Sequence, residues 1–172
     1  IGQARKLAKQ LGTTVEVVLL GDNIEEQARD LFSFGADRVY LGNASVLSQY
    51  QSEIYTDIIV KLAREKKPDI MLIGSTHMGR ELAPLVAARL QTGLTAHCID
   101  LVLNQENIME QKIPAYGGLI SIVCPEKRPQ MATVAKGVFP VPEAETGRTG
   151  ELITLGLAAD LSSRVRTLEI VR

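Results

Sequence analysis

Short runs of hydrophobic residues alternate with helix-like segments along the first half of the chain. Residues 15–20, 38–41 and 69–73 form such runs, and glycine, proline or polar residues bound them, as expected of buried strands. Residues 1–11 and the segment that begins at Ser52 instead repeat their hydrophobic residues every three or four positions, which indicates amphipathic helices. This alternation predicts right-handed βαβ units and therefore an α/β fold with a parallel sheet.

The pattern changes after residue 93, where strand-like segments follow one another without helices between them. The segments are residues 95–103, 107–113, 119–124 and 130–135. We expect them to provide the final strand of the parallel sheet and an antiparallel addition to it. Residues 141–150 have the composition of a linker, and two short strand-like pieces at 151–155 and 164–171 close the chain.

Composition narrows the range of functions. The 172 residues fit one domain, and 19 Lys and Arg side chains against 20 Asp and Glu leave a net charge of −1, with no strong field to attract nucleic acid. Aromatic residues make up 4% of the chain and Trp is missing, so stacking on single-stranded nucleic acid is not expected. No hydrophobic run approaches the ~20 residues of a membrane span. We therefore expect neither nucleic acid as a partner nor membrane insertion.

Candidate catalytic and metal-binding residues are few. His77 and His97 are the only histidines and have no ligand-like spacing, so a surface or hydrogen-bonded role is favoured over a metal site. Cys98 and Cys124 lie in hydrophobic strands without a CxxC motif, which is typical of reduced thiols in the cytoplasm. No serine lies in a GxSxG motif. We expect no catalytic residue and no metal ligand.

The stretch GSTHMGRELAP, residues 74–84, connects a predicted strand to a predicted helix. Pro84 fits among the first four residues of a helix, which places the expected helix start near residues 79–81. The loop before it then lies at a positive helix end, where anions bind, and at the carboxyl edge of a parallel strand. Its candidate anion-binding or docking residues are Gly74, Ser75, Thr76, Gly79 and Arg80.

The same stretch matches neither the P-loop pattern nor GxGxxG, so it has no specific nucleotide motif. A structural alternative is that Thr76 caps the helix and Arg80 pairs with a carboxylate of a neighbouring element or partner. We also expect Leu85 on the buried face of this helix. Asp100, within the predicted strand CIDLVL, requires solvent or a partner and thus an edge or interface position.

Two longer segments resemble a known family. DIMLIGSTHMGRELAPLVAARLQTGLTAHCIDL and KIPAYGGLISIVCPEKRPQMATVAKGVF are similar to the amino-terminal domain of the electron transfer flavoprotein alpha subunit. That family has G-[AS]-T-x-x-G-R-[DE]-L-A-P after a strand, then a [FY]-G-G element and R-P-Q-M-A-T-V followed by G-V-F. All of these elements occur here in order. The resemblance covers roughly residues 1–142.

The resemblance implies a Rossmann-like fold of the adenine nucleotide alpha hydrolase type, with a parallel sheet flanked by helices. It implies a domain at residues 1–142 that lacks its first strand, and a linker with closing strands at 143–172. In the family, FAD is held mainly by a carboxy-terminal domain, so we expect no FAD contact within this chain and expect the natural protein to extend at both ends.

The implied function is that of an electron carrier rather than an enzyme. Family members are heterodimers of alpha and beta subunits that accept electrons from flavin dehydrogenases, in the cytoplasm or, in eukaryotes, the mitochondrial matrix. The beta subunit binds AMP or a second flavin in a related fold, whereas the alpha domain is not known to bind a nucleotide. The resemblance thus implies that this domain is a scaffold that docks the beta subunit, and that the Gly74–Arg80 loop packs against the partner or the flavin domain.

Two alternatives stay open at this point. One is a stand-alone nucleotide-binding or adenylate-hydrolysing α/β domain that uses the Gly74–Arg80 loop, for which Asp69, Glu81 and Asp100 are the available carboxylates. The other is a regulatory module that merely shares the fold.

Overall fold

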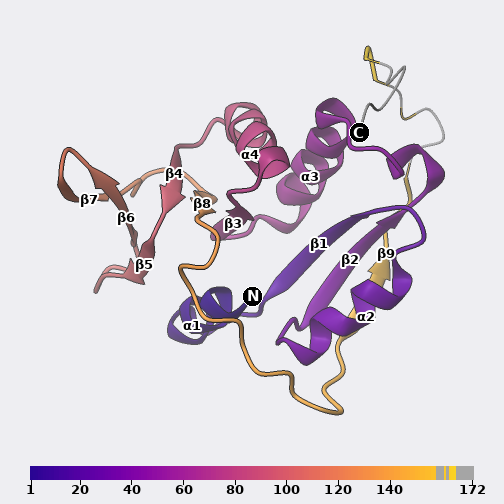
Figure 1. Ribbon diagram of the computed structural model, residues 1–172, viewed down its shortest axis with the longest axis horizontal. Helices are drawn as coiled ribbons and strands as arrows, with labels where there is room; N and C mark the ends of the chain where they lie inside the picture. The colour runs from indigo at the N-terminus through magenta and orange to yellow at the C-terminus, as the bar shows by residue number, and fades with distance from the viewer. Residues whose placement is uncertain (158–160, 162, 166–172) are drawn as a thin grey trace.

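The computed structural model describes residues 1–157, 161 and 163–165, and it confirms the predicted α/β fold (Figure 1). The helices are α1 (Gly2–Leu11), α2 (Glu25–Ser33), α3 (Ser52–Lys66) and α4 (His77–Leu90), with a 3₁₀ turn η1 (Ser45–Leu47). The strands are β1 (Glu16–Gly21), β2 (Arg38–Asn43), β3 (Ile70–Gly74), β4 (Leu94–Cys98), β5 (Asp100–Leu103), β6 (Met109–Ala115), β7 (Gly118–Ile122), β8 (Gln130–Val134) and β9 (Glu151–Thr154). Most of the strand expected at 164–171 lies outside the described residues.

The parallel strands form two sheets rather than the one that was expected. One sheet has the order β1-β2-β9 and the other the order β3-β8-β4. Within the described residues, β1 pairs on one side only, with β2, and β3 pairs on one side only, with β8. No described strand joins these two edges, which is the physical reason that the sheet is divided.

The segment predicted as one strand at residues 95–103 is two strands. The register between β4 and β8 shifts between Thr95 and Cys98, and His97 has a backbone φ of +59° in the left-handed region. This break turns the chain out of the parallel sheet into the antiparallel sheet β5-β6-β7. β8 then returns to lie between β3 and β4, so residues 130–134 are a central parallel strand of their sheet.

The antiparallel sheet confirms the predicted addition in the second half of the chain. β5 is one of its outer strands, and Asp100 at the start of β5 accepts a hydrogen bond from the Lys112 ammonium on β6 at 2.8 Å. Asp100 therefore has the edge position that its carboxylate requires.

α4 covers its sheet with a different face from the one that was expected. Leu82 and Val86 are buried against Met131 of the central strand β8. Leu85, which was expected to be buried, is 40% exposed, so that prediction is wrong. The buried stripe follows positions 79, 82, 83, 86 and 87, and residue 85 lies outside it.

The start of α4 also differs from the expected position. The helix begins at His77 rather than at residues 79–81, and Pro84 lies in its interior. Pro84 lacks the N–H that would pair with the carbonyl of Arg80, but it is exposed, and solvent can reach this side of the helix. At α2, Ile24 is the residue before the first turn, and no side chain caps that helix.

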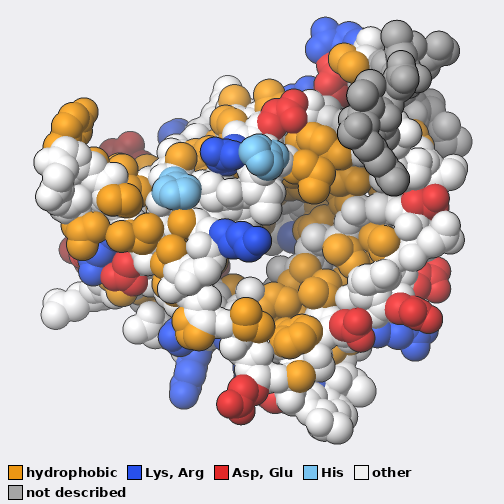
Figure 2. Space-filling model, in the orientation of Figure 1, with side chains coloured by type: hydrophobic (Ala, Val, Ile, Leu, Met, Phe, Trp, Pro, Cys, Tyr) orange, Lys and Arg blue, Asp and Glu red, His pale blue; other side chains and the backbone are white. Residues whose placement is uncertain are grey.

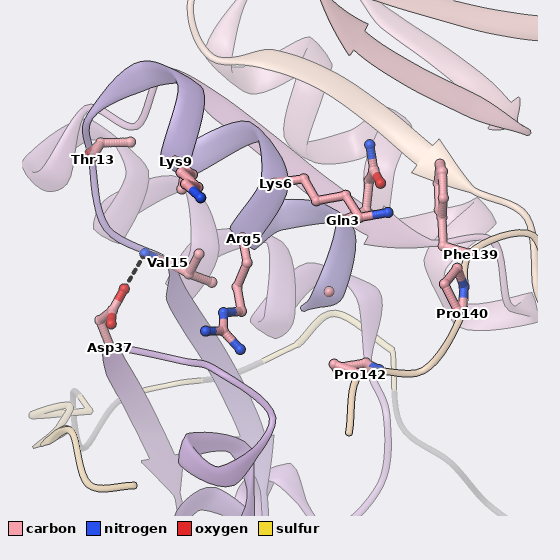
Figure 3. A pocket seen from close by; sticks show the side chains of 12 residues that line it. Gln3, Arg5, Lys6, Lys9, Thr13, Val15, Asp37, Phe139, Pro140 and Pro142 are labelled. Carbon is pink, nitrogen blue, oxygen red and sulfur yellow. Dashed lines mark hydrogen bonds between the residues drawn. The ribbon is translucent and has the colours of Figure 1, made fainter. Parts of the chain in front are cut away.

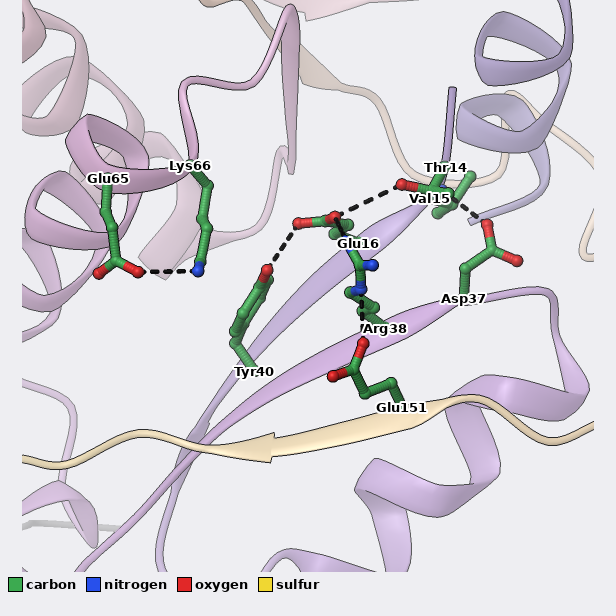
Figure 4. A network of polar contacts seen from close by, with 9 residues as sticks. All are labelled: Thr14, Val15, Glu16, Asp37, Arg38, Tyr40, Glu65, Lys66 and Glu151. Atoms are coloured by element: carbon green, nitrogen blue, oxygen red, sulfur yellow. Dashed lines mark hydrogen bonds and ion pairs between the residues drawn. The ribbon is translucent and has the colours of Figure 1, made fainter. Parts of the chain in front are cut away.

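β9 joins the first sheet through a network of charged side chains (Figure 4). Arg38 of β2 donates hydrogen bonds to Glu16 of β1 at 2.8 Å and to Glu151 of β9 at 2.7 Å. The Tyr40 hydroxyl donates to the other oxygen of Glu16 at 2.9 Å. One arginine thus connects three parallel strands at their amino-terminal end.

The segment 143–150, expected as a linker, has no helix or strand but is attached to the domain. Glu145 accepts a hydrogen bond from Arg5 of α1 at 2.6 Å and one from Arg148 at 3.1 Å. Arg148 also donates to Asp37 at 2.8 Å. These ion pairs fix the path by which the chain reaches β9.

Candidate functional site

The Gly74–Arg80 loop lies at the carboxyl edge of the sheet β3-β8-β4. β3 ends at Gly74 and α4 begins three residues later. The backbone N–H of Ser75 donates to the carbonyl of Val134 at the end of β8, at 2.8 Å. Neighbouring parallel strands therefore bring the loop to the edge where ligands bind in open α/β sheets, as the sequence predicted.

Gly79 is required by packing within the loop. A Cβ atom at this position would lie 1.9 Å from the carbonyl oxygen of Gly74, much closer than any contact between such atoms allows. Gly74 has no such constraint, because the nearest neighbour of a Cβ atom added there would be a methyl group of Thr76 at 3.9 Å. The first turn of α4 thus approaches the end of β3 closely, and the space beside Gly79 is filled by protein rather than left open for a phosphate.

Thr76 caps α4, as the structural alternative proposed. Its hydroxyl accepts a hydrogen bond from the backbone N–H of Gly79 at 3.1 Å. This bond uses one of the amide groups that a phosphate at a helix N-terminus would otherwise contact. The loop therefore offers an anion fewer free donors than its sequence suggested.

Ser75 and His97 come together across 22 residues of sequence. The Ser75 hydroxyl lies 3.3 Å from His97 Nδ1. The backbone N–H of His97 donates at 2.7 Å to the hydroxyl of Thr133, whose side chain is on the central strand β8 and is 1% exposed. The buried threonine thus supports the left-handed backbone of His97. Sequence reasoning missed Thr133, because a threonine inside a hydrophobic strand gives no signal of such a role.

Arg80 and His77 form a second pair on the first turn of α4. An Nη atom of Arg80 lies 3.2 Å from His77 Nδ1. Among the described residues Arg80 has no carboxylate partner within salt-bridge distance, unlike the pairing that the structural alternative expected. Figure 2 shows both histidines on one face of the molecule, with Lys or Arg side chains near them. We call Ser75, His77, Arg80 and His97 the α4-start cluster.

A hollow of about 520 Å³ adjoins the α4-start cluster, between the end of β1 and the starts of α3 and α4. Tyr50, Tyr55 and Met78 are among the residues that line it. The two tyrosine rings meet edge to face with centroids 5.0 Å apart. Removal from water and, next, the Glu81 carboxylate raise the pKa of Tyr50 to about 12, so its hydroxyl stays protonated at neutral pH.

A second hollow, of about 500 Å³, lies between α1 and residues 139–142 (Figure 3). Basic side chains of α1 line part of it, and one of them, Arg5, is paired with Glu145. Asp37, which also lines the hollow, accepts a hydrogen bond from the backbone N–H of Val15 at 2.8 Å. Arg5 therefore holds α1 to the segment that contains Glu145, and Asp37 fixes the residue before β1.

Other candidate groups are separated from the α4-start cluster or are inert. Asp100 is paired with Lys112 in the antiparallel sheet, and Asp69 lies before β3, at the opposite end of that strand from the loop. Burial raises the pKa of the Cys98 thiol to about 11, so this cysteine is protonated at neutral pH. Among the described residues there is no group of three His, Cys, Asp or Glu side chains placed to hold a metal ion.

The described helices include none that is both long enough and hydrophobic enough to span a membrane.

Comparison with known proteins gives a consistent result. The profile of a family described as "Electron transfer flavoprotein domain" matches residues 1–160. The chain is 45% identical over 170 residues to the electron transfer flavoprotein subunit alpha of Thermoanaerobacterium thermosaccharolyticum, which covers 97% of this chain and 51% of the relative. It is 43% identical over 143 residues to the subunit of the same name from Clostridium acetobutylicum, covering 81% of this chain and 42% of the relative.

A third relative has a different name. The lactate dehydrogenase (NAD(+),ferredoxin) subunit LctC of Acetobacterium woodii is 37% identical over 175 residues, covering 100% of this chain and 42% of the relative. The chain thus spans about half the length of these curated relatives. On the family match and these identities, the chain belongs to the electron transfer flavoprotein family.

Proposed function

We propose that this chain is the amino-terminal domain of the alpha subunit of an electron transfer flavoprotein, a heterodimeric carrier that accepts electrons from flavin dehydrogenases. FAD is held by a carboxy-terminal domain outside residues 1–172, and this domain acts as a scaffold that docks the beta subunit. It performs no bond-making chemistry of its own. The observation that carries the proposal is the family match over residues 1–160, together with relatives named as alpha subunits.

The Gly74–Arg80 loop supports a docking role over a cofactor role. The Gly74 carbonyl occupies the place that a Cβ atom at Gly79 would take, and the Gly79 N–H donates a hydrogen bond to the Thr76 hydroxyl. These contacts leave little of the loop for a phosphate, while Arg80 and His77 are exposed. An exposed guanidinium can form a bidentate contact with a carboxylate of another subunit or domain.

The two open sheet edges support the proposal that the α/β domain at residues 1–142 is completed by a further strand; they do not bear on residues 143–172, of which β9 pairs with β2 in the first sheet. β1 and β3 are hydrophobic strands of the type that is covered on both faces, yet Val18 of β1 is 37% exposed. Figure 2 shows an opening with hydrophobic side chains near the centre of the molecule, between the places of β1 and β3 in Figure 1. In the full-length subunit, a parallel strand from before α1 would join the two edges into one sheet.

Substitution of Arg80 tests the docking role. In the full-length subunit with its partner, Arg80→Ala should weaken the heterodimer about tenfold, because a charge-assisted contact is lost. Arg29→Ala, at an exposed arginine on α2, is the matched control and should leave the affinity unchanged. Analytical ultracentrifugation measures the dissociation constant. Unchanged affinity together with unchanged flavin retention in the Arg80→Ala protein would contradict docking through this loop.

A stand-alone nucleotide-binding domain is the second candidate function. The observation in its favour is the hollow of about 520 Å³ beside Met78, at the carboxyl edge of the strands. Titration calorimetry with ADP decides between the candidates. Tight binding to a protein that lacks both flavin and a second subunit would favour this alternative over the electron carrier.

A further inference from the structure

The β6–β7 hairpin projects from one end of the molecule, at the left of Figure 1. β6 and β7 pair antiparallel from Gln111–Ile122 to Ala115–Gly118, and Tyr116 and Gly117 form the turn between them. β7 is the second outer strand of the sheet β5-β6-β7, opposite β5. Among the described residues no strand pairs with the other side of β7, so its outer edge has backbone groups available for a further strand.

The outer edge of β7 lacks the features that usually keep an open edge from pairing with other chains. Natural edge strands are protected by charged residues, proline or bulges. Residues 116–123, YGGLISIV, contain neither charge nor proline, and the pairing of β6 with β7 runs without a register shift. Leu119 is 65% exposed, and Ile120 and Val123 are also exposed to solvent. An exposed, uncharged edge with hydrophobic side chains is expected to be covered by a partner.

Tyr116 adds a second observation at the tip of the hairpin. Its backbone φ is +51°, followed by +78° at Gly117, as in the two-residue turns of tight hairpins. Asparagine, aspartate or glycine usually takes the first of these positions, because a bulky residue is strained there. The tyrosine side chain is nevertheless fully exposed, at 102% of its reference area. Tyrosine is also a residue type that frequently dominates the binding energy of interfaces.

The position of Pro114 shows which backbone groups face outward. Opposite residues in an antiparallel pair alternate between hydrogen-bonded and non-hydrogen-bonded pairs. Pro114 has no N–H, and it is opposite Leu119, which is consistent with a non-hydrogen-bonded pair. By alternation, Ser121 opposite Lys112 is also in such a pair. The N–H groups of Leu119 and Ser121 therefore point to the outer edge, where they can donate hydrogen bonds to the carbonyl groups of a partner strand.

We propose that the outer edge of β7 and the Tyr116 side chain bind the second subunit of the carrier, which adds an extended, uncharged hydrophobic strand to this edge. The inference rests on the proposed function, in which the chain belongs to a two-subunit protein. Strand addition satisfies the free backbone groups, and a pocket for Tyr116 supplies specificity. The relatives are themselves named as subunits.

The location of the hairpin favours another subunit over the segment of the same chain that follows β9. β9, the last described strand, belongs to the sheet β1-β2-β9, which lies on the opposite side of the molecule from β7 (Figure 1). A segment that follows β9 would have to cross the whole domain to reach the β7 edge. A second subunit meets no such restriction.

Three variants of the full-length subunit, measured with the purified second subunit, test the proposal. Tyr116→Asn removes the side chain but relieves the turn, because Asn tolerates a positive φ, so the variant should fold at least as well as the parent. Leu119→Lys places a charge on the edge. Each should weaken the heterodimer at least about tenfold. Val141→Lys, at an exposed hydrophobic residue outside the hairpin, is the matched control and should bind normally.

Hydrogen exchange gives a direct readout of strand addition. Peptides that contain residues 119–121 should exchange more slowly in the heterodimer than in the free subunit, because outward N–H groups become hydrogen-bonded. One result would overturn the docking surface but leave the proposed function standing. In that case the parent heterodimer forms, both hairpin variants bind the second subunit with full affinity, and hydrogen exchange of residues 119–121 does not change on binding. If the parent subunits do not associate at all, both fail. The proposal would also be overturned if the alpha subunit associates with itself, Tyr116→Asn abolishes this self-association, and the affinity of the heterodimer does not change. The edge would then bind a second copy of the same chain.

Discussion

Gly79 has no room for a side chain, because the carbonyl of Gly74 occupies the place of a Cβ atom. A glycine in a loop before a helix is commonly interpreted as space for a phosphate, and the sequence pattern of residues 74–80 permitted that interpretation. In this chain the glycine instead allows the helix α4 to approach the strand β3. The same residue type at the same place thus serves packing rather than ligand binding.

Replacement of Gly79 distinguishes these two roles. In the full-length subunit, Gly79→Ala should lower the free energy of unfolding by about 2–4 kcal/mol, because a backbone carbonyl cannot move away from the new methyl group. Without the clash, alanine would raise the free energy of unfolding by about 1 kcal/mol, because alanine has a higher helix propensity than glycine. Urea denaturation measures the difference, and Gly74→Ala is the control, because the nearest neighbour of its added methyl group would be 3.9 Å away. A stabilised Gly79→Ala protein would show that the close approach is wrong.

Of the other contacts of the Gly74–Arg80 loop, one could be predicted from the sequence and one could not. The capping role of Thr76 was foreseen, because a threonine directly before a helix is a recognised cap. The pairing of Ser75 with His97 was not, since it depends on the parallel placement of β3, β8 and β4. Short-range patterns contain no information on which strands become neighbours.

At the scale of elements, the face of α4 that packs on β8 gives a prediction with its own control. Leu82→Ala should lower the free energy of unfolding by about 2–5 kcal/mol, because Leu82 is buried in the core with Met131. Leu85→Ala should cost less than about 1 kcal/mol, because Leu85 is largely exposed. Thermal or urea denaturation of the two full-length variants provides the comparison. Equal losses of stability would mean that the helix is rotated relative to this description.

Most elements could be predicted from hydrophobic periodicity, whereas several of their boundaries could not. The strands at residues 16–21, 38–43 and 70–74 coincide with the predicted hydrophobic runs. The start of α4 was misplaced because the rule for proline assumes that an interior proline is excluded, and Pro84 is tolerated on an exposed face. The break at His97 was missed because nothing in the residue type announces a positive φ.

At the level of the whole molecule, the unpaired sheet edges and the length of the relatives are the features on which the proposed carrier rests. β1 and β3 each have an unpaired edge within the described chain, and β7 has another at the far end of the molecule. The chain also spans about half the length of its relatives. In the proposed carrier, the first two edges are joined by a strand of the same subunit and the third is covered by the partner. The domain is then a scaffold, and the flavin lies elsewhere.

Native mass spectrometry combined with a visible absorption spectrum tests whether this chain belongs to a flavin-containing heterodimer. The sample is the product of the complete gene, co-expressed with a candidate second subunit. For the proposed carrier we expect a yellow, one-to-one complex in which the polypeptide that contains this sequence is longer than 172 residues and the flavin is retained. A colourless single chain of about 172 residues that carries a nucleotide would contradict the electron-carrier function and assign the chemistry to the region around the start of α4.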